Sequence, residues 1–124
     1  MKYLLDTNTC IYLFVDAYPR LAERVSDMPE GSLAISAVTY GELAVGTFRG
    51  KPPAPDLLAR FVAQVPVVPF DEAAASCFAR LPFRRGSFDR LIAGHALALG
   101  IGLVSRNIAD FADIPGLMVE DWTA

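Results

Sequence analysis

The chain has 124 residues, of which 53% are hydrophobic and 20% charged, and its formal net charge at pH 7 is −3. This composition excludes a disordered segment, and the length suits one domain that spans residues 1–124. The longest apolar run, from Ala96 to Val104, is far below the roughly 20 residues that span a bilayer. Asp6 comes too early for a secretory signal. We therefore expect a cytoplasmic protein with no membrane partner.

Short apolar strands alternate with amphipathic helices along the chain. In the first half we expect, in order, a strand over Lys2–Leu5, a helix from the Asp6-Thr7-Asn8 turn through Val15, a helix over Tyr18–Met28, a strand over Leu33–Ser36, and helices over Val38–Thr47 and Asp56–Val65. In the second half we expect a strand over Val65–Phe70, a helix opened by Asp71 and ended or kinked by Pro82, a helix from the N-cap Ser87 to Leu99, a strand over Ile101–Ser105, a short helix over Asn107–Ala112 and a strand over Leu117–Glu120. Pro66 and Pro69 place the third strand near a sheet edge. The alternation predicts an α/β fold, with a parallel sheet covered on both faces.

The cysteines and the single histidine do not suggest a site. Cys10, Cys77 and His95 are too few and too scattered for structural zinc, so we expect both thiols to pack as small hydrophobic groups. His95 lies six residues after Asp89, on another helix face, which favours a packed or capping histidine over a catalytic one. A single histidine also excludes a two-histidine ribonuclease mechanism. No nucleotide-loop or nucleophile-elbow motif occurs.

Four acids fall at strand exits or helix starts, namely Asp6, Glu42, Asp89 and Asp110. Sites in open parallel sheets form beyond the carboxyl ends of the strands, so these side chains can converge on one edge. Each also has a simpler explanation. Asp6 could cap the helix that follows, Asp89 could favour a helix dipole, and the other two could be solvated surface charges.

Carboxylates that converge repel one another unless a cation lies between them. Mg²⁺ prefers oxygen ligands and takes one or two protein carboxylates together with water and substrate phosphate. Such a site can support phosphodiester hydrolysis. If metal neutralises four acids, the net charge of −3 becomes slightly positive and is no argument against a nucleic-acid substrate. Arginines also cluster in one stretch, at Arg80, Arg84, Arg85 and Arg90.

Five ordered blocks carry a resemblance to a known family. They are YLLDTN (3–8), ISAVTYGEL (35–43) with Gly46, FDEAAA (70–75), GSFDRLIAGHAL (86–97) and an ending made of VSRN (104–107), DF (110–111), PGL (115–117) and EDW (120–122). Together they cover essentially the whole chain. The chain resembles PIN-domain ribonucleases, specifically the VapC toxins of bacterial type II toxin–antitoxin modules.

The resemblance implies a three-layer α/β/α Rossmann-like sandwich and an endoribonuclease that depends on Mg²⁺, or alternatively Mn²⁺. By this resemblance Asp6 and Asp89 are the main metal ligands, and Glu42 is a third acid that holds metal directly or through water. The remaining implied site residues are Asn107 and Asp110 at a variable fourth position, and Thr7 and Asn8 as orienting partners of Asp6. Separately, we hypothesise that the arginines of 84–90, Arg90 among them, and Arg106 hold the phosphates that flank the cleaved bond, although a solvated face explains these arginines equally well.

The resemblance also implies partners, namely an RNA substrate, a VapB-type antitoxin, a homodimer or a dimer within the complex, and operator DNA bound through the antitoxin. Two departures from the family pattern stand out. The stretch from Arg80 to Gly86 is shorter than usual, and Ser105-Arg106-Asn107 replaces the commoner Thr-x-Asn. Two alternatives stay open: a catalytically inactive interaction module and a metal-dependent phosphatase. The aromatic residues that could form an apolar interface, although a core role suits most of them, are Tyr12, Phe14, Tyr18 and Phe61.

Overall fold

Five parallel strands form one sheet at the centre of the protein, in the order β3-β2-β1-β4-β5. The computed structural model describes residues 1–84 and 87–124. The strands are β1 (Tyr3–Leu5), β2 (Leu33–Ser36), β3 (Val67–Val68), β4 (Gly102–Val104) and β5 (Val119–Glu120). The helices are α1 (Thr7–Phe14), α2 (Pro19–Asp27), α3 (Ala37–Phe48), α4 (Pro55–Gln64), α5 (Glu72–Ala79), α6 (Phe88–Leu99) and a 3-10 turn, η1 (Ile108–Phe111).

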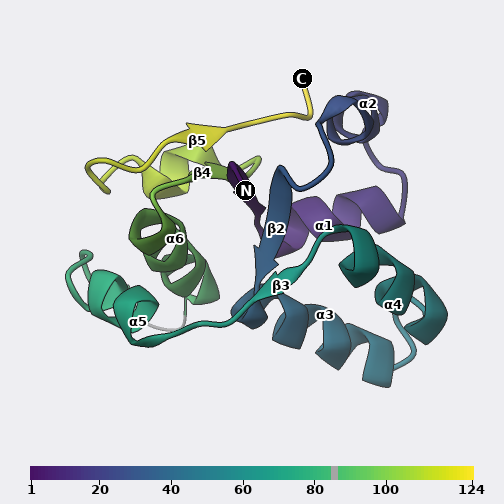
Figure 1. Ribbon diagram of the computed structural model, residues 1–124, viewed down its shortest axis with the longest axis horizontal. Coiled ribbons are helices and arrows are strands. Elements are labelled where there is room, and N and C mark those ends of the chain that lie inside the picture. The colour runs from purple at the N-terminus through teal and green to yellow at the C-terminus, as the bar shows by residue number, and fades with distance from the viewer. Residues whose placement is uncertain (85–86) are drawn as a thin grey trace.

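Helices cover both faces of the sheet, as predicted (Figure 1). Consecutive residues of a strand point to opposite faces, and β1 shows the result, since Leu5 packs in one core and Leu4 in the other. The Leu5 core takes residues from α1 to α4, and the Leu4 core takes residues from α6 and η1. The predicted α/β/α architecture is therefore confirmed.

The helix ends follow local side-chain chemistry. Ser36 caps α3 by accepting a hydrogen bond from the Val38 amide (3.1 Å), and Asp71 caps α5 by accepting one from the Ala74 amide (3.0 Å). Helix α5 ends at Ala79, before Pro82, as predicted. Ser87 does precede α6, but its side chain makes no capping hydrogen bond, so that part of the prediction is wrong.

Strand β3 is shorter than predicted, with two residues in place of six. Pro66 and Pro69 flank it and have no amide hydrogen to extend the ladder. Its position at the edge of the sheet is confirmed by the strand order.

The packing of the thiols and of His95 agrees in part with the sequence. Cys10 is fully buried, whereas Cys77 on α5 is only half-buried, which corrects the prediction for that thiol.

His95 is buried, its Nδ1 lies 2.8 Å from the Ser36 hydroxyl oxygen, and its ring meets Phe70 edge-on. Burial lowers the pKa of His95. The prediction of a packed histidine is confirmed.

The four aromatic residues considered for an interface, on α1, just before α2 and on α4, pack against the core. Tyr12 meets Tyr18 edge-on, Phe14 meets Phe61 in the same way, and all four lie against the Leu5 core. All four are partly buried, so they contribute to the core, as was expected for most of them. No helix in residues 1–84 and 87–124 has the length and hydrophobicity needed to cross a bilayer.

Glu120 ties the C-terminal segment to the sheet. Its carboxylate accepts hydrogen bonds from the Trp122 indole (3.0 Å) and the Tyr3 hydroxyl (2.8 Å), and Arg24 lies 3.7 Å away. The Trp122 hydrogen bond, then that of Tyr3 and the Arg24 charge, lower the pKa of Glu120.

A depressed folded-state pKa means that the Glu120 carboxylate stabilises the fold above its unfolded pKa of about 4.3, and this stabilisation is lost as the pH falls through the folded value. We expect Glu120→Gln to lower the free energy of unfolding at pH 7. The gap to the wild type should begin to narrow as the pH falls below about 4.3, and it should close only below the depressed folded-state pKa, where both side chains are neutral. Urea unfolding of both proteins at several pH values measures this difference in the free energy of unfolding. A difference that does not change with pH would contradict the role of the Glu120 charge.

Candidate acidic site

The topology brings the four predicted acids toward one edge of the sheet. Strands β1, β2 and β4 are parallel neighbours, so their carboxyl ends share that edge. Asp6 follows β1 directly, and Glu42 lies in the second turn of α3, the helix that follows β2. Helix α6 precedes β4 and runs antiparallel to it, so the first turn of α6 lies at the edge where β4 ends. Asp89 is in that first turn and therefore lies at the same edge. Asp110 lies in η1, just after β4.

Asp6 is held in place by backbone groups. Its amide donates to the Val104 carbonyl (3.1 Å), and its Oδ1 accepts from the Thr9 amide (2.8 Å). Asp6 therefore caps α1, as its simpler explanation predicted. Its Oδ2 makes no hydrogen bond to the described residues, although only 3% of the residue is exposed. Capping thus uses one oxygen and leaves the other available.

Thr7 contacts Glu42 rather than Asp6. The Thr7 hydroxyl donates to Glu42 Oε1 at 2.6 Å and lies 3.3 Å from the Thr39 hydroxyl. Asn8 is exposed, and neither it nor Thr7 makes a hydrogen bond to the Asp6 side chain. The expectation that these two residues orient Asp6 is therefore corrected, because the Thr9 amide has that role and Thr7 fixes the third acid.

If Glu42 contributes to catalysis, Thr7→Val should lower the rate of RNA cleavage by about 10- to 100-fold, the usual cost of losing a hydrogen bond to an active-site carboxylate. Valine keeps the shape but removes the hydroxyl. Thr7→Ser is the matched control, since it restores the donor, and it should recover most of the rate. Equal rates for Thr7→Val and the wild type would exclude the role.

Asp89 lies in the combined negative field of the other acids. Burial raises the pKa of Asp89, the charges of Asp6, Glu42 and Asp110 raise it further, and Arg90 opposes them. In the described residues, no ion pair includes any of these four carboxylates. The site therefore carries negative charge that no basic side chain neutralises directly.

This donor set suits a hard divalent cation. All the ligand atoms on offer are carboxylate oxygens, and their mutual repulsion is what a dication relieves. Within the part of the chain that the structure describes, no three histidine, cysteine or acidic side chains lie close enough to form a ready metal cage. Mg²⁺ commonly takes only one or two protein carboxylates and keeps several waters, so an open site of this kind fits it.

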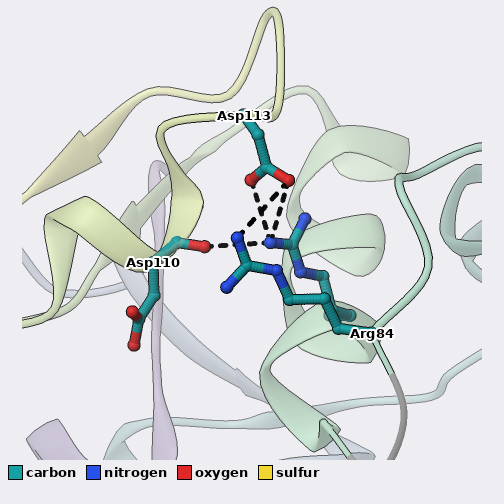
Figure 2. Close-up of polar contacts among 4 residues, drawn as sticks. Arg84, Asp110 and Asp113 are labelled. Atoms are coloured by element: carbon teal, nitrogen blue, oxygen red, sulfur yellow. Dashed lines mark hydrogen bonds and ion pairs between the residues drawn. The ribbon is translucent and has the colours of Figure 1, made fainter.

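The basic residues differ from expectation. Arg90 is only 2% exposed, and its guanidinium donates to Asp113 and to the backbone carbonyl of Asp110. It therefore lies inside the protein rather than on a phosphate-binding surface. Arg84 is half exposed and approaches the same Asp113 carboxylate at 3.7 Å (Figure 2). Arg85, with Gly86, lies outside the described residues.

The segment after β4 presents two exposed polar residues. The Arg106 guanidinium lies 5.3 Å from the centre of the Tyr18 ring, and the Asn107 amide donates to the Ser105 hydroxyl oxygen (3.1 Å). The replacement of threonine by Ser105 therefore keeps a working hydroxyl. Asn107 precedes η1 and leaves its own side chain without a hydrogen bond to the described residues.

Two residues near the acids were missed by sequence reasoning. Thr39 lies one helical turn before Glu42 on α3, a spacing that could have indicated a shared face. Asp113 is 23 residues from its partner Arg90, and no local pattern in the sequence indicated this contact.

The family of the chain follows from its relatives. A family model described as "PIN domain" matches residues 3–117. A tRNA(fMet)-specific endonuclease VapC from Shigella flexneri is 34% identical over 99% of both chains, and Ribonuclease VapC1 from Haemophilus influenzae strain R2866 is 33% identical over 99% of both. The chain belongs to the PIN domain family, whose nucleases depend on metal. Within that family it groups with the VapC ribonucleases.

Solved structures agree with this assignment. The DNA-bound VapBC structure from Salmonella typhimurium has a TM-score of 0.82 and 31% identity over 98% of both chains. VapBC-1 from nontypeable Haemophilus influenzae has a TM-score of 0.81 and 30% identity over 100% of both. The alignment with the Shigella relative spans 132 positions, more than the 124 residues of this chain, so that relative has residues that this chain lacks. This agrees with the expectation that one segment of this chain is shorter than in its relatives.

Proposed function

We propose that this protein is the toxin of a VapBC-type toxin–antitoxin pair, a metal-dependent endoribonuclease whose residues 1–124 act as one PIN domain in the cytoplasm. The observation that carries the proposal is the placement of Asp6, Glu42, Asp89 and Asp110 at the edge where the parallel strands β1, β2 and β4 end, with no basic side chain pairing with these carboxylates among the described residues. The VapC relatives are named as an endonuclease and a ribonuclease, which supports phosphodiester hydrolysis as the chemistry of this site.

The acids would divide the work at the site. Asp6 and Asp89 would hold a divalent ion, Mg²⁺ first and Mn²⁺ as an alternative, with Glu42 acting directly or through water. When bound, such an ion polarises the scissile phosphate and makes water a better nucleophile. Asp110 adds a fourth negative charge to the same edge.

Glu42 is suited to orient the attacking water. The Thr7 hydroxyl occupies Glu42 Oε1, which leaves Oε2 to accept a hydrogen bond from water. The carboxylate is held in one orientation, so a proton lost from that water has a fixed acceptor. Arg106 is exposed and charged, and it would bind a phosphate beside the cleaved bond.

The substrate would be RNA with an accessible single-stranded loop, because paired A-form RNA hides its base edges in a narrow groove. The name of the Shigella relative specifies tRNA(fMet), and initiator tRNA is therefore the first substrate to assay. The neighbouring structures are of VapBC proteins, which supports a VapB-type antitoxin as the partner. The protein would also form a homodimer, alone or within that complex. Operator DNA would be bound through the antitoxin.

The direct test is cleavage of initiator tRNA by the purified, antitoxin-free protein in the presence of Mg²⁺. We expect discrete 5′ ends in sequencing that disappear with EDTA and return with added Mg²⁺ or Mn²⁺. Asp6→Asn should give none of these ends while keeping the circular dichroism spectrum of the fold. Phosphate release from p-nitrophenyl phosphate without RNA cleavage would favour the phosphatase alternative, and antitoxin binding without either activity would favour the inactive interaction module.

A further inference from the structure

Arg90 has an unusual setting for a charged residue. It is only 2% exposed, and its hydrogen bonds to the described residues all come from one nitrogen, Nη2. This nitrogen lies 2.8 and 3.2 Å from the two carboxylate oxygens of Asp113 and 3.1 Å from the carbonyl oxygen of Asp110. The other terminal nitrogen, Nη1, is buried without a partner among the described residues.

Stability alone does not account for this arrangement. A buried guanidinium with an unsatisfied nitrogen is costly, and an apolar side chain of similar size is often no worse for the fold. The contacts have a specific geometry, however, since they join two segments that both carry acids of the candidate site. Arg90 is the neighbour of Asp89 on α6, and its acceptors Asp110 and Asp113 belong to η1 and the turn after it.

The Asp110 carboxylate itself takes no part in these bonds. It points away from both guanidinium groups, and only the backbone carbonyl of Asp110 faces them (Figure 2). The bond to the carbonyl therefore fixes the backbone of η1 while it leaves the side chain of Asp110 free to act elsewhere. The negative charge of that side chain reaches Asp89.

We propose that Arg90 is a positioning residue, which fastens the turn carrying Asp110 to the helix carrying Asp89 and so fixes the separation of the two carboxylates. Asp113 is its counter-ion and completes the fastening. This inference rests on the proposed function, because it assigns Arg90 a role in forming the metal site.

Mn²⁺ affinity tests the proposal, because charge and position predict opposite signs. If Arg90 acted only through its positive charge, Arg90→Gln would tighten Mn²⁺ binding, since a repulsive charge beside the acids is lost. If it positions Asp110, the same variant should weaken binding, by about tenfold. Titration calorimetry with Mn²⁺ alone measures the affinity without any RNA.

Matched variants separate the contact from the charge. Arg84→Gln removes a charge beside the same Asp113 carboxylate, but Arg84 makes no bond to Asp110, so Mn²⁺ affinity should stay unchanged or tighten slightly. Arg90→Lys should recover part of the affinity, because one nitrogen makes all the contacts and an ammonium group can donate to the same acceptors. Asp113→Ala, at a partly exposed position, should weaken binding as Arg90→Gln does and serves if that variant does not fold.

Wild-type affinity in folded Arg90→Gln, or in Asp113→Ala if Arg90→Gln does not fold, would overturn the positioning role and leave the proposed function intact. Tighter Mn²⁺ binding in whichever of these two variants is measured would also overturn the positioning role and leave the proposed function intact. Failure of the wild-type protein itself to bind Mn²⁺ would overturn both the proposed function and this inference. Weaker binding in the Arg90 and Asp113 variants, with Arg84→Gln unaffected, is the result that supports it.

Discussion

Asp89→Asn should abolish RNA cleavage and at the same time raise the melting temperature of the metal-free protein. The rate is expected to fall about a thousandfold, because charge stabilisation by a bound metal is worth several kcal/mol and about 4 kcal/mol corresponds to that factor. The stability gain has a separate cause. Burial and three neighbouring acids penalise the Asp89 carboxylate, and asparagine removes that penalty.

The matched control for Asp89 is Asp56→Asn, which removes one negative charge from an exposed position in the first turn of α4. Asp56 pairs with Arg60 at 3.8 Å and lies on a different helix from all four acids. This variant should cleave RNA at the wild-type rate and melt at the same temperature or slightly below it. Full activity in Asp89→Asn, measured by initial rates on tRNA with thermal melts beside them, would reject Asp89 as a metal ligand.

Gly94→Ala should destabilise the protein by about 1–3 kcal/mol, although alanine is the better helix former. A Cβ on Gly94 would lie 2.7 Å from both the Cα and the amide nitrogen of Phe78. These are backbone atoms of α5, so relief requires the two helices to move apart. Helix α6 carries Asp89, and a shift of this helix would disturb the site as well as the core.

Gly41→Ala is the control for helix propensity. Gly41 lies within α3, and an added Cβ there meets nothing within 4 Å. Alanine should therefore stabilise this variant by about 0.5–1 kcal/mol. Denaturant melts of both variants give the comparison. A Gly94→Ala protein as stable as the wild type would show that α5 and α6 adapt at little cost.

Much of the fold was predictable because its signals are local. Apolar runs bounded by polar turns indicated the strands. Helix α6 ends at Leu99, as predicted, and Gly100 follows it in the left-handed conformation (φ 69°) that glycine adopts readily. The failures arose where tertiary packing decides. Sequence spacing placed Ser87 before α6 but could not show whether its hydroxyl reaches an amide, and Cys77 turned out to lie on a helix face that is only half covered.

The placement of the four acids at one edge of the sheet was predictable from topology, since parallel strands end at one edge and a helix that leads into such a strand begins there. Their partners were not, because each contact joins segments far apart in the chain. Thr7 is next to Asp6 in sequence but bonds to Glu42, 35 residues away. Arg90 was expected to bind phosphate together with the other arginines. Its side chain is instead buried, and its guanidinium donates to Asp113. These pairings depend on the final packing of α1 against α3 and of α6 against η1 and the turn after it.

A Mn²⁺ titration of the wild type, Asp6→Asn, Asp89→Asn and the double variant tests most directly whether these carboxylates form one divalent-metal centre. If both acids bind the same ion, each single variant should lose most of the affinity, and the double variant should lose less than the sum of the two losses. Two independent sites would instead give additive losses, with half of the bound metal kept in each single variant. Undiminished Mn²⁺ affinity in the double variant would contradict the shared centre altogether.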